Sequence, residues 1–152
     1  MNINIRHIEA KDNAAIATII KDALTEFGAN RPGTVFTDPT TDALFELFQK
    51  DGAAYFIAEQ DSTIVGGGGY YPTEGLPEDT CELVKMYLSP AVRGKGLGRT
   101  LIEKSMAAAK EYGYKRMYLE SMPELKQALN TYAKFGFDYL PGPMGNSGHT
   151  GC

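Results

Sequence analysis

The stretch "VRGKGLGRT", residues 92–100, decides the fold because it places three glycines and three basic residues between two patterned segments. The apolar run "CELVKMYL" (81–88) predicts a strand before it, and apolar spacing predicts a helix over 98–112 after it. Glycines let the backbone approach a ligand, and a helix start adds unpaired N–H groups and a positive dipole end. This combination favours an anion cradle over a plain surface turn. The cradle would comprise Arg93, Gly94, Lys95, Gly96, Leu97, Gly98 and Arg99.

Two other phosphate-binding motifs do not fit this stretch. The P-loop pattern G-x-x-x-x-G-K-[ST] is absent from the chain. In the dinucleotide pattern G-x-G-x-x-G, Gly94 and Gly96 fit the first two places, but the third falls on Arg99. The spacing present is Arg93-x-x-Gly96-x-Gly98, at a strand-to-helix junction.

Outward from this junction, hydrophobic periodicity and turn residues define the remaining elements. The strand at 81–88, the helix at 98–112 and a strand at 114–120 predict a right-handed parallel βαβ unit. Earlier strands read as an antiparallel meander, so the fold class is α/β (α+β), a mixed, mostly antiparallel sheet with helices on both faces. We expect one domain over 1–152. Strands are predicted at 3–10, 54–60, 62–72, 81–90, 114–122 and 137–141, and helices at 11–28, 40–52, 98–112 and 123–135.

Composition narrows the class of protein. The 152 residues carry a net charge of −4, which gives no case for a nucleic-acid or membrane partner. Cys81 and Cys152 do not suggest a disulfide framework, and the chain starts without an apolar signal core, so we expect a cytoplasmic location. No Cys, His or Asp spacing suggests a metal site. His7 is interpreted as structural, and His149 has no assigned role.

Two motifs resemble those of one known family. "VRGKGLG" (92–98) is similar to the R/Q-x-x-G-x-G/A motif of the GCN5-related N-acetyltransferases (GNAT). "NTYAKFGF" (130–137) resembles the family's second signature, a helical tyrosine four residues before Gly-Phe. Two motifs at the right separation are more specific than either alone, and the predicted order of elements is also that of the family. The resemblance covers nearly the whole chain, as a single acyl-CoA N-acyltransferase domain.

The resemblance implies an enzyme with acetyl-CoA as cosubstrate and no metal. Acetyl-CoA would lie between strands 81–88 and 114–120, where the backbone of Met86, Tyr87 and Leu88 would bond the pantetheine arm. The N–H groups from Arg93 to Arg99 would hold the pyrophosphate. The implied reaction moves an acetyl group to a primary amine, on a small molecule or a peptide, by direct attack through a tetrahedral intermediate. The alternatives are a non-catalytic CoA-binding sensor of the same fold and another phosphate-ligand protein with the same cradle.

Three residues are candidates for proton transfer. Tyr132 matches the family tyrosine that protonates the departing thiolate, although by its spacing alone it reads as an interior aromatic residue. A phenol beside a nascent thiolate can donate a proton. Glu82 and Glu120 are candidate general bases, each acting through a water, and each also reads as an ordinary carboxylate at a strand end.

The chain departs from the family pattern in two places. Leu125 stands where the family often has an asparagine that contacts pantetheine. The glycine-rich tail "GPMGNSGHTGC" (142–152) replaces the last family strand, so that strand is missing or truncated, or an edge is left open beside 137–140. Exposed sheet edges tend to pair, which predicts a homodimer.

The run "GGGG" (66–69) is unusual inside a strand. Such glycines mark a bulge or a close backbone approach. The run therefore has two interpretations that the sequence does not separate: room for a ligand beside the acetyl group, or a distorted strand end. Tyr70 and Tyr71 follow it and, with the loop 29–39, are candidates to line the acceptor site.

Overall fold

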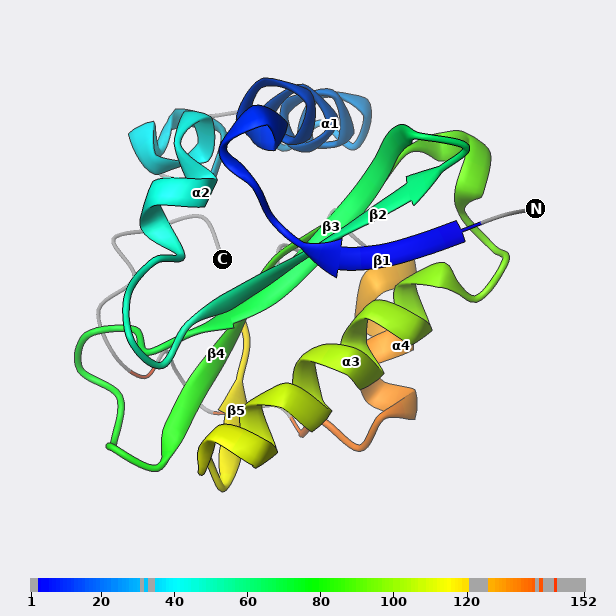
Figure 1. Cartoon of the computed structure of the whole chain (residues 1–152). Coiled ribbons are helices and arrows are strands. Elements are labelled where there is room, and N and C mark those ends of the chain that lie inside the picture. The colour runs from blue at the N-terminus through cyan, green and yellow to red at the C-terminus, as the bar shows by residue number, and fades with distance from the viewer. Residues whose placement is uncertain are drawn as a thin grey trace.

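The protein forms one five-stranded sheet in a computed structural model that describes residues 3–30, 32, 35–120, 126–138, 140 and 144 (Figure 1). The strands lie in chain order, antiparallel from β1 to β4 and parallel between β4 and β5. The predicted mixed sheet with a parallel βαβ unit is therefore confirmed. The strands are β1 (Ile3–His7), β2 (Ala54–Gln60), β3 (Thr63–Tyr71), β4 (Thr80–Leu88) and β5 (Arg116–Tyr118).

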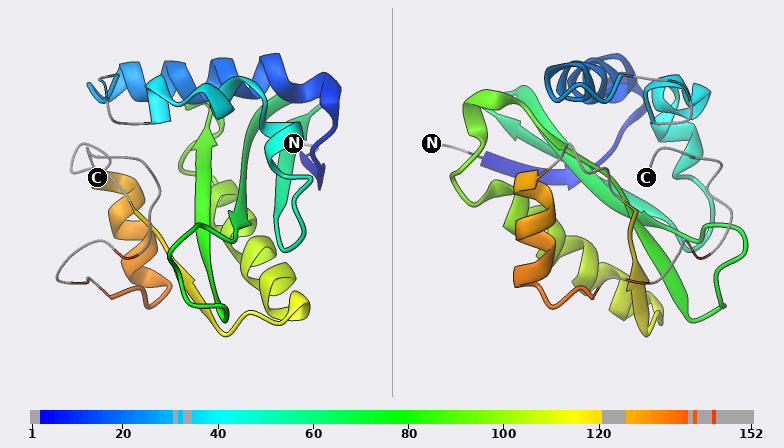
Figure 2. Two further views of the ribbon diagram at one scale, coloured as in Figure 1. Left: turned by 90° about the vertical axis from the view of Figure 1, so that its left-hand side faces the viewer. Right: turned by 180° about the vertical axis from the view of Figure 1, so that it is seen from behind.

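Helices cover both faces of this sheet, with α1 and α2 on one side and α3 and α4 on the other (Figures 1 and 2). Successive side chains of β2 point to opposite faces of the sheet and so contribute to both cores. Tyr55 packs into the core under α1, and Phe56 packs into the core over α3. None of the described helices is long and apolar enough to cross a membrane. The helices are α1 (Asn13–Glu26), α2 (Leu44–Leu47), α3 (Leu97–Tyr112) and α4 (Lys126–Lys134), with short 3-10 turns η1 (Ala10–Asp12), η2 (Val35–Thr37), η3 (Pro39–Asp42) and η4 (Pro90–Val92).

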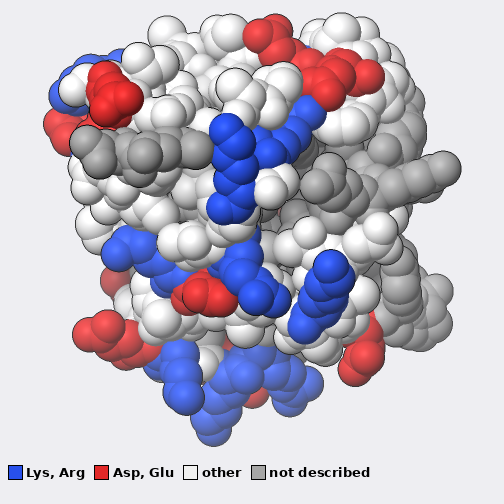
Figure 3. Space-filling view, turned by 90° about the vertical axis from the view of Figure 1, so that its right-hand side faces the viewer, with Lys and Arg blue, Asp and Glu red and all other residues white. Residues whose placement is uncertain are grey.

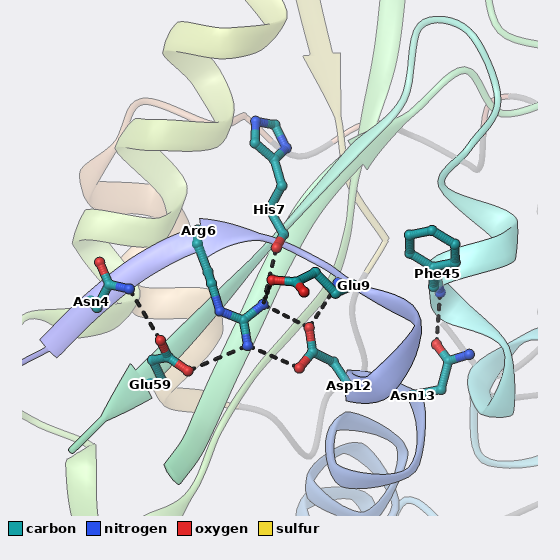
Figure 4. Close-up of polar contacts among 8 residues, drawn as sticks. All are labelled: Asn4, Arg6, His7, Glu9, Asp12, Asn13, Phe45 and Glu59. Carbon is teal, nitrogen blue, oxygen red and sulfur yellow. Dashed lines mark hydrogen bonds and ion pairs between the residues drawn. The ribbon is translucent and has the colours of Figure 1, made fainter. Parts of the chain in front are cut away.

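A partly buried ion pair ties β1 to η1, the turn that leads into α1 (Figure 4). The Arg6 guanidinium donates to both carboxylate oxygens of Asp12, at 2.7 and 2.9 Å, and to Glu59 at 3.3 Å. Burial alone would raise the pKa of Asp12, but hydrogen bonds from Arg6 and from the Glu9 N–H hold this pKa below its ordinary value. Asp12 stands at the N-cap position of α1 without capping it, because its carboxylate is engaged by Arg6 and Glu9.

The predicted helix over 40–52 is wrong in extent. It is divided at Ala43, whose φ of −137° and ψ of 47° separate η3 from the four-residue α2. The Asn13 carboxamide oxygen accepts the Phe45 N–H at 2.8 Å, which fixes the short helix against the start of α1 (Figure 4).

The predicted strand over 137–141 is absent from its described part. Phe137, Asp138 and Leu140 adopt no strand, and the remaining two positions lie outside the described residues. Phe137 packs edge-on against Tyr132, with the two ring centroids 6.1 Å apart. The homodimer stays a prediction, but it has lost the strand edge on which it rested. Leu125 and most of the tail also lie outside the described residues.

Candidate functional site

The loop before α3 has the conformation that an anion cradle requires. Gly94 and Gly96 have φ values of +75° and +85°, and a Cβ at either would meet no atom within 4 Å. Gly96 is the N-cap of α3 and no side chain caps it, so first-turn N–H groups of α3 face outward without an intrahelical partner. The loop lies on the side of the molecule in Figure 3, where Lys and Arg side chains gather.

A pocket of about 470 Å³ opens where the end of β4 meets α1, the start of α3 and α4. It brings together most of the predicted site: Met86, Tyr87, Leu88, Arg93, Gly94, Gly96, Gly98, Arg99 and Tyr132 line it. Two of the residues predicted to bind the cofactor do not line it: Lys95 is exposed beside it, and Leu97 packs into the core. Six further residues line the pocket that the sequence did not assign to a site. Helical periodicity predicted only packing for Ala23, Phe27 and Ile102, and no role was predicted for Thr131, Lys134 and Phe135.

The pocket lies where β4 extends beyond the end of its parallel neighbour, β5. Pairing with β5 begins at Thr80 opposite Arg116 and ends at Glu82 opposite Tyr118, whereas β4 continues to Leu88. The β4–β5 ladder ends at Glu82, so β5 does not cover the later part of this edge of β4. An extended, amide-containing ligand can bond to such an edge as an added strand does.

Arg93 has a different place from the one the cradle prediction gave it. Its guanidinium donates to the Leu88 carbonyl at 3.1 and 2.9 Å and to Glu26 at 2.6 Å, and it lies over the Phe27 ring. Its N–H donates to Pro90. Arg93 therefore joins α1 to the end of β4 as part of the pocket wall. Arg99 is exposed over the Phe135 ring at the same pocket, with its charge available to an anion.

Tyr132 projects from α4 into the pocket wall. Burial raises the pKa of its hydroxyl to about 12, so the phenol keeps its proton at neutral pH and can donate a hydrogen bond. The side chain keeps an intermediate exposure because the pocket that it lines is open.

Glu82 is a buried carboxyl group with an unusual pKa. It is 5% exposed, and its pKa is raised from 4.5 to about 7: burial is the largest cause and Glu120 also raises the pKa, whereas Thr73 and Lys85 lower it. The Thr73 hydroxyl donates to Glu82, and the Tyr118 hydroxyl donates to Glu120 at 2.7 Å. A group that is half-ionised near neutral pH has the protonation behaviour of a general base.

The structure thus gathers the two candidate bases around Tyr118, the β5 partner of Glu82. They are not among the residues that line the pocket. Three strand residues lie between Glu82 and Met86, a span of about 13 Å, so a proton passing to Glu82 from an amine in the pocket needs an intervening water. Sequence reasoning missed Thr73 and Tyr118. The signal for Tyr118 was its position two residues before Glu120, on one face of a strand.

The glycine run 66–69 lies within β3, paired with β2 and β4. A Cβ at Gly66 would lie 2.6 Å from Leu88 Cδ2, and one at Gly67 would lie 2.6 Å from Tyr55 Cε2. At Gly68 it would overlap the Met86 side chain, and at Gly69 the Ala54 carbonyl oxygen. Protein atoms occupy this space, so the interpretation as room for a ligand is wrong. The irregularity is a shift in register opposite Gly68, within a paired strand.

Comparisons with known proteins identify the family and the fold. A model of the acetyltransferase (GNAT) family matches residues 16–137. The chain is 40% identical to the uncharacterized N-acetyltransferase YjgM of Escherichia coli, over 97% of this chain and 89% of that protein. A Staphylococcus aureus GNAT-family acetyltransferase superposes with a TM-score of 0.83 at 20% identity, over 96% and 91% of the chains. A predicted Clostridium acetobutylicum acetyltransferase, solved with acetyl-CoA, gives 0.75 at 20% identity, over 94% of each chain.

Proposed function

Because the chain belongs to the acetyltransferase (GNAT) family and is thereby an acetyl-CoA-dependent N-acetyltransferase, we propose that it moves the acetyl group to a primary amine by direct attack on the thioester. The observation that supports this most is that one pocket is lined by the glycine loop, the end of β4 and Tyr132. A module that only binds CoA would not need the Tyr132 hydroxyl there.

Binding in this proposal uses the backbone more than side chains. The pyrophosphate lies at the N–H groups from Gly94 to Arg99, where the dipole of α3 and the Arg99 charge favour it. The pantetheine amides bond to β4 from Met86 to Leu88. Arg93 already donates twice to the Leu88 carbonyl, so at that residue the N–H is the better partner for the ligand.

The chemical step is an acyl transfer from the thioester to the amine. The neutral amine nitrogen attacks the thioester carbon, and the tetrahedral oxyanion then expels the CoA thiolate as the C–S bond breaks. Glu82 accepts a proton from the amine through a water, and the Tyr132 hydroxyl donates a hydrogen bond to the sulfur of the departing thiolate, which takes its proton from solvent. Complete transfer from Tyr132 to a free thiolate is uphill, since the phenol pKa is about 12 and a thiol's is about 8.5. The Tyr132 hydroxyl therefore acts chiefly by a hydrogen bond that strengthens as charge develops on sulfur.

The acceptor in this proposal is a small-molecule amine or a peptide amine. One structural neighbour, at 17% identity, was solved with the bisubstrate analog CoA-S-monomethyl-acetylneamine. This shows that the shared fold accommodates both substrates in that protein. Mass spectrometry of an amine panel after incubation with acetyl-CoA would identify the acceptor here.

Tyr132→Phe tests the proposal because it keeps the ring and deletes the hydroxyl. We expect kcat to fall about 10²-fold, an ordinary acid–base contribution, with little change in the KM for acetyl-CoA. Tyr112→Phe, at an exposed hydroxyl bonded to Asp51, is the matched control and should leave both constants unchanged. Release of free thiol reports turnover. A wild-type protein that binds acetyl-CoA but releases no thiol with any amine would instead be the non-catalytic sensor.

A further inference from the structure

One tyrosine reaches across the glycine strand. Tyr55 belongs to β2, yet its hydroxyl donates to the carbonyl of Lys85, two strands away in β4, at 2.6 Å. The side chain is 1% exposed. It passes over Gly67, where a Cβ would lie 2.6 Å from Tyr55 Cε2 and 2.8 Å from its hydroxyl oxygen. A glycine at 67 is what leaves this path open.

The carbonyl that Tyr55 bonds belongs to a bulge. Tyr87 opposes Gly67 and Val84 opposes Gly69, so Lys85 and Met86 together face the single residue Gly68. Lys85 has a φ of +56°, which residues with a side chain adopt only when their surroundings hold them. A bulge leaves a ladder group without a strand partner, and a buried carbonyl needs a donor. Burial raises the pKa of Tyr55 well above its ordinary value, so its hydroxyl keeps the proton that it donates.

The side chain of the bulge residue is anchored as well. The Lys85 ammonium lies 3.5 Å from the Asp38 carboxylate, and the Lys85 side chain is 5% exposed. Both ends of Lys85 are therefore fixed, the carbonyl by β2 and the ammonium by the segment beside η3. The three residues that follow, Met86 to Leu88, line the pocket, so the angle at which their backbone meets the pocket depends on Lys85.

We infer that Tyr55 is a positioning residue for acetyl-CoA: its hydroxyl, crossing β3 at Gly67, holds the Lys85 bulge so that the backbone of 86–88 is preset for the pantetheine arm. The inference rests on the proposed acetyl-CoA site. Tyr55 touches no ligand in this arrangement and acts only through β4. Without its hydroxyl, the bulge is free to sample other conformations, and binding must first order it.

Tyr55→Phe and Tyr114→Phe form a matched pair for the test. Each deletes one hydroxyl that donates to a backbone carbonyl, to Lys85 at 2.6 Å or to Gly52 at 2.8 Å, but only the first carbonyl belongs to β4. Both variants should lose a similar few degrees of Tm, about 2–4 °C. Only Tyr55→Phe should raise the Kd for acetyl-CoA in calorimetry, by about fivefold to tenfold. Without ligand, amide exchange over 85–88 should quicken in Tyr55→Phe and stay unchanged in Tyr114→Phe.

The outcomes separate this inference from the proposed function. If the wild-type protein binds no acetyl-CoA, the proposed function fails, whereas amide exchange over 85–88 still reports whether Tyr55 holds the bulge. If the wild type binds and both variants bind equally well, the positioning role is overturned and the Tyr55 hydroxyl serves stability alone. Equal exchange over 85–88 in the two variants overturns it as well.

Discussion

Two glycine clusters, 94–98 and 66–69, lie on either side of β4 in the sequence and use the missing side chain for opposite reasons. Gly94 and Gly96 have left-handed φ values and open space around them, so their absent Cβ frees the backbone angles. The glycines of β3 do not have such angles, but a Cβ at any of them would collide with protein atoms. The first cluster borders the pocket, and the second makes room for Tyr55, Met86 and Leu88.

The two clusters predict different effects of a substitution on stability and on ligand binding. Replacing a crowded glycine strains the folded protein whether or not a ligand is present. Replacing an open glycine beside the pocket changes mainly what the pocket can hold.

Gly69→Ala should be the most damaging of the glycine substitutions. The new methyl would overlap the Ala54 carbonyl oxygen and lie 2.8 Å from Tyr55 Cα, and backbone atoms cannot rotate away as a side chain can. Overpacking of this kind costs about 3 kcal/mol or more when the backbone must move. Urea denaturation measures this loss. Gly94→Ala is the control from the open cluster and should cost only about 1 kcal/mol, the penalty of a left-handed residue. Equal losses would erase the distinction between the clusters.

The contrast between the clusters suggests that buried sheet residues serve packing and that loop residues serve function. Glu82 is an exception to test, because it is buried in β4 and is proposed as the general base. Glu82→Gln should lower kcat/KM by about 10²-fold above neutral pH. With a pKa of about 7, the ionised base of the wild type disappears as pH falls below 7, so kcat/KM should drop there, and the variant should lack this limb. The acceptor amine titrates equally in both proteins, so the difference between their profiles isolates Glu82.

Stability gives Glu82 a second, independent signature. Folding raises its pKa from 4.5 to about 7, so the protonated carboxyl contributes stability that is full below pH 4.5 and is lost as pH rises through 7. Glu82→Gln should therefore gain stability relative to wild type as pH rises through that window.

Glu120→Gln tests the other candidate base. If it removes the acidic limb of kcat/KM and Glu82→Gln does not, the base is Glu120.

Gly96→Asp tests the open cluster itself. An aspartate at this position would place a negative charge where the cradle should hold the pyrophosphate, so the Kd for acetyl-CoA should rise at least about tenfold, or 1.4 kcal/mol. Gly113→Asp is the matched control, since Gly113 ends the same helix with a φ of +125° and no atom within 4 Å of its absent Cβ. Calorimetry with acetyl-CoA compares them. Unchanged binding in Gly96→Asp would remove the cradle.

The sequence predicted the local elements well and the long-range contacts poorly. The strand at 54–60 and the junction at 92–98 carry their signals within a few residues, and the structure has both. The purpose of the run at 66–69 depends on Tyr55, Met86 and Leu88, which lie 12 to 22 positions away from its members. No local pattern reveals which side chains will lie over a glycine, so two interpretations stayed open and neither named the tyrosine.

The site was predicted unevenly for the same reason. Helical spacing and a motif located Tyr132 and the glycine loop, and the pocket does contain them. The Arg93 contact with Glu26 joins residues 67 positions apart, and the Thr73 contact with Glu82 depends on strand register. Such contacts decide whether a charged side chain is free for a ligand or is part of a wall. They require the fold first.

Gly98→Ala should have the smallest effect and the opposite sign, which sharpens the comparison most. Gly98 is neither crowded nor left-handed: its Cβ would meet Leu88 Cδ1 at 3.5 Å, an ordinary contact, and it lies inside α3. Alanine there should raise the free energy of unfolding by about 0.5–1 kcal/mol, because glycine loses more backbone entropy in a helix. The added methyl carries no charge and leaves the N–H in place, so the Kd for acetyl-CoA should change less than about threefold, under 1 kcal/mol. Thermal unfolding with and without acetyl-CoA measures both. A destabilised Gly98→Ala would mean that the start of α3 needs glycine for its own fold, and the open cluster would then resemble the crowded one.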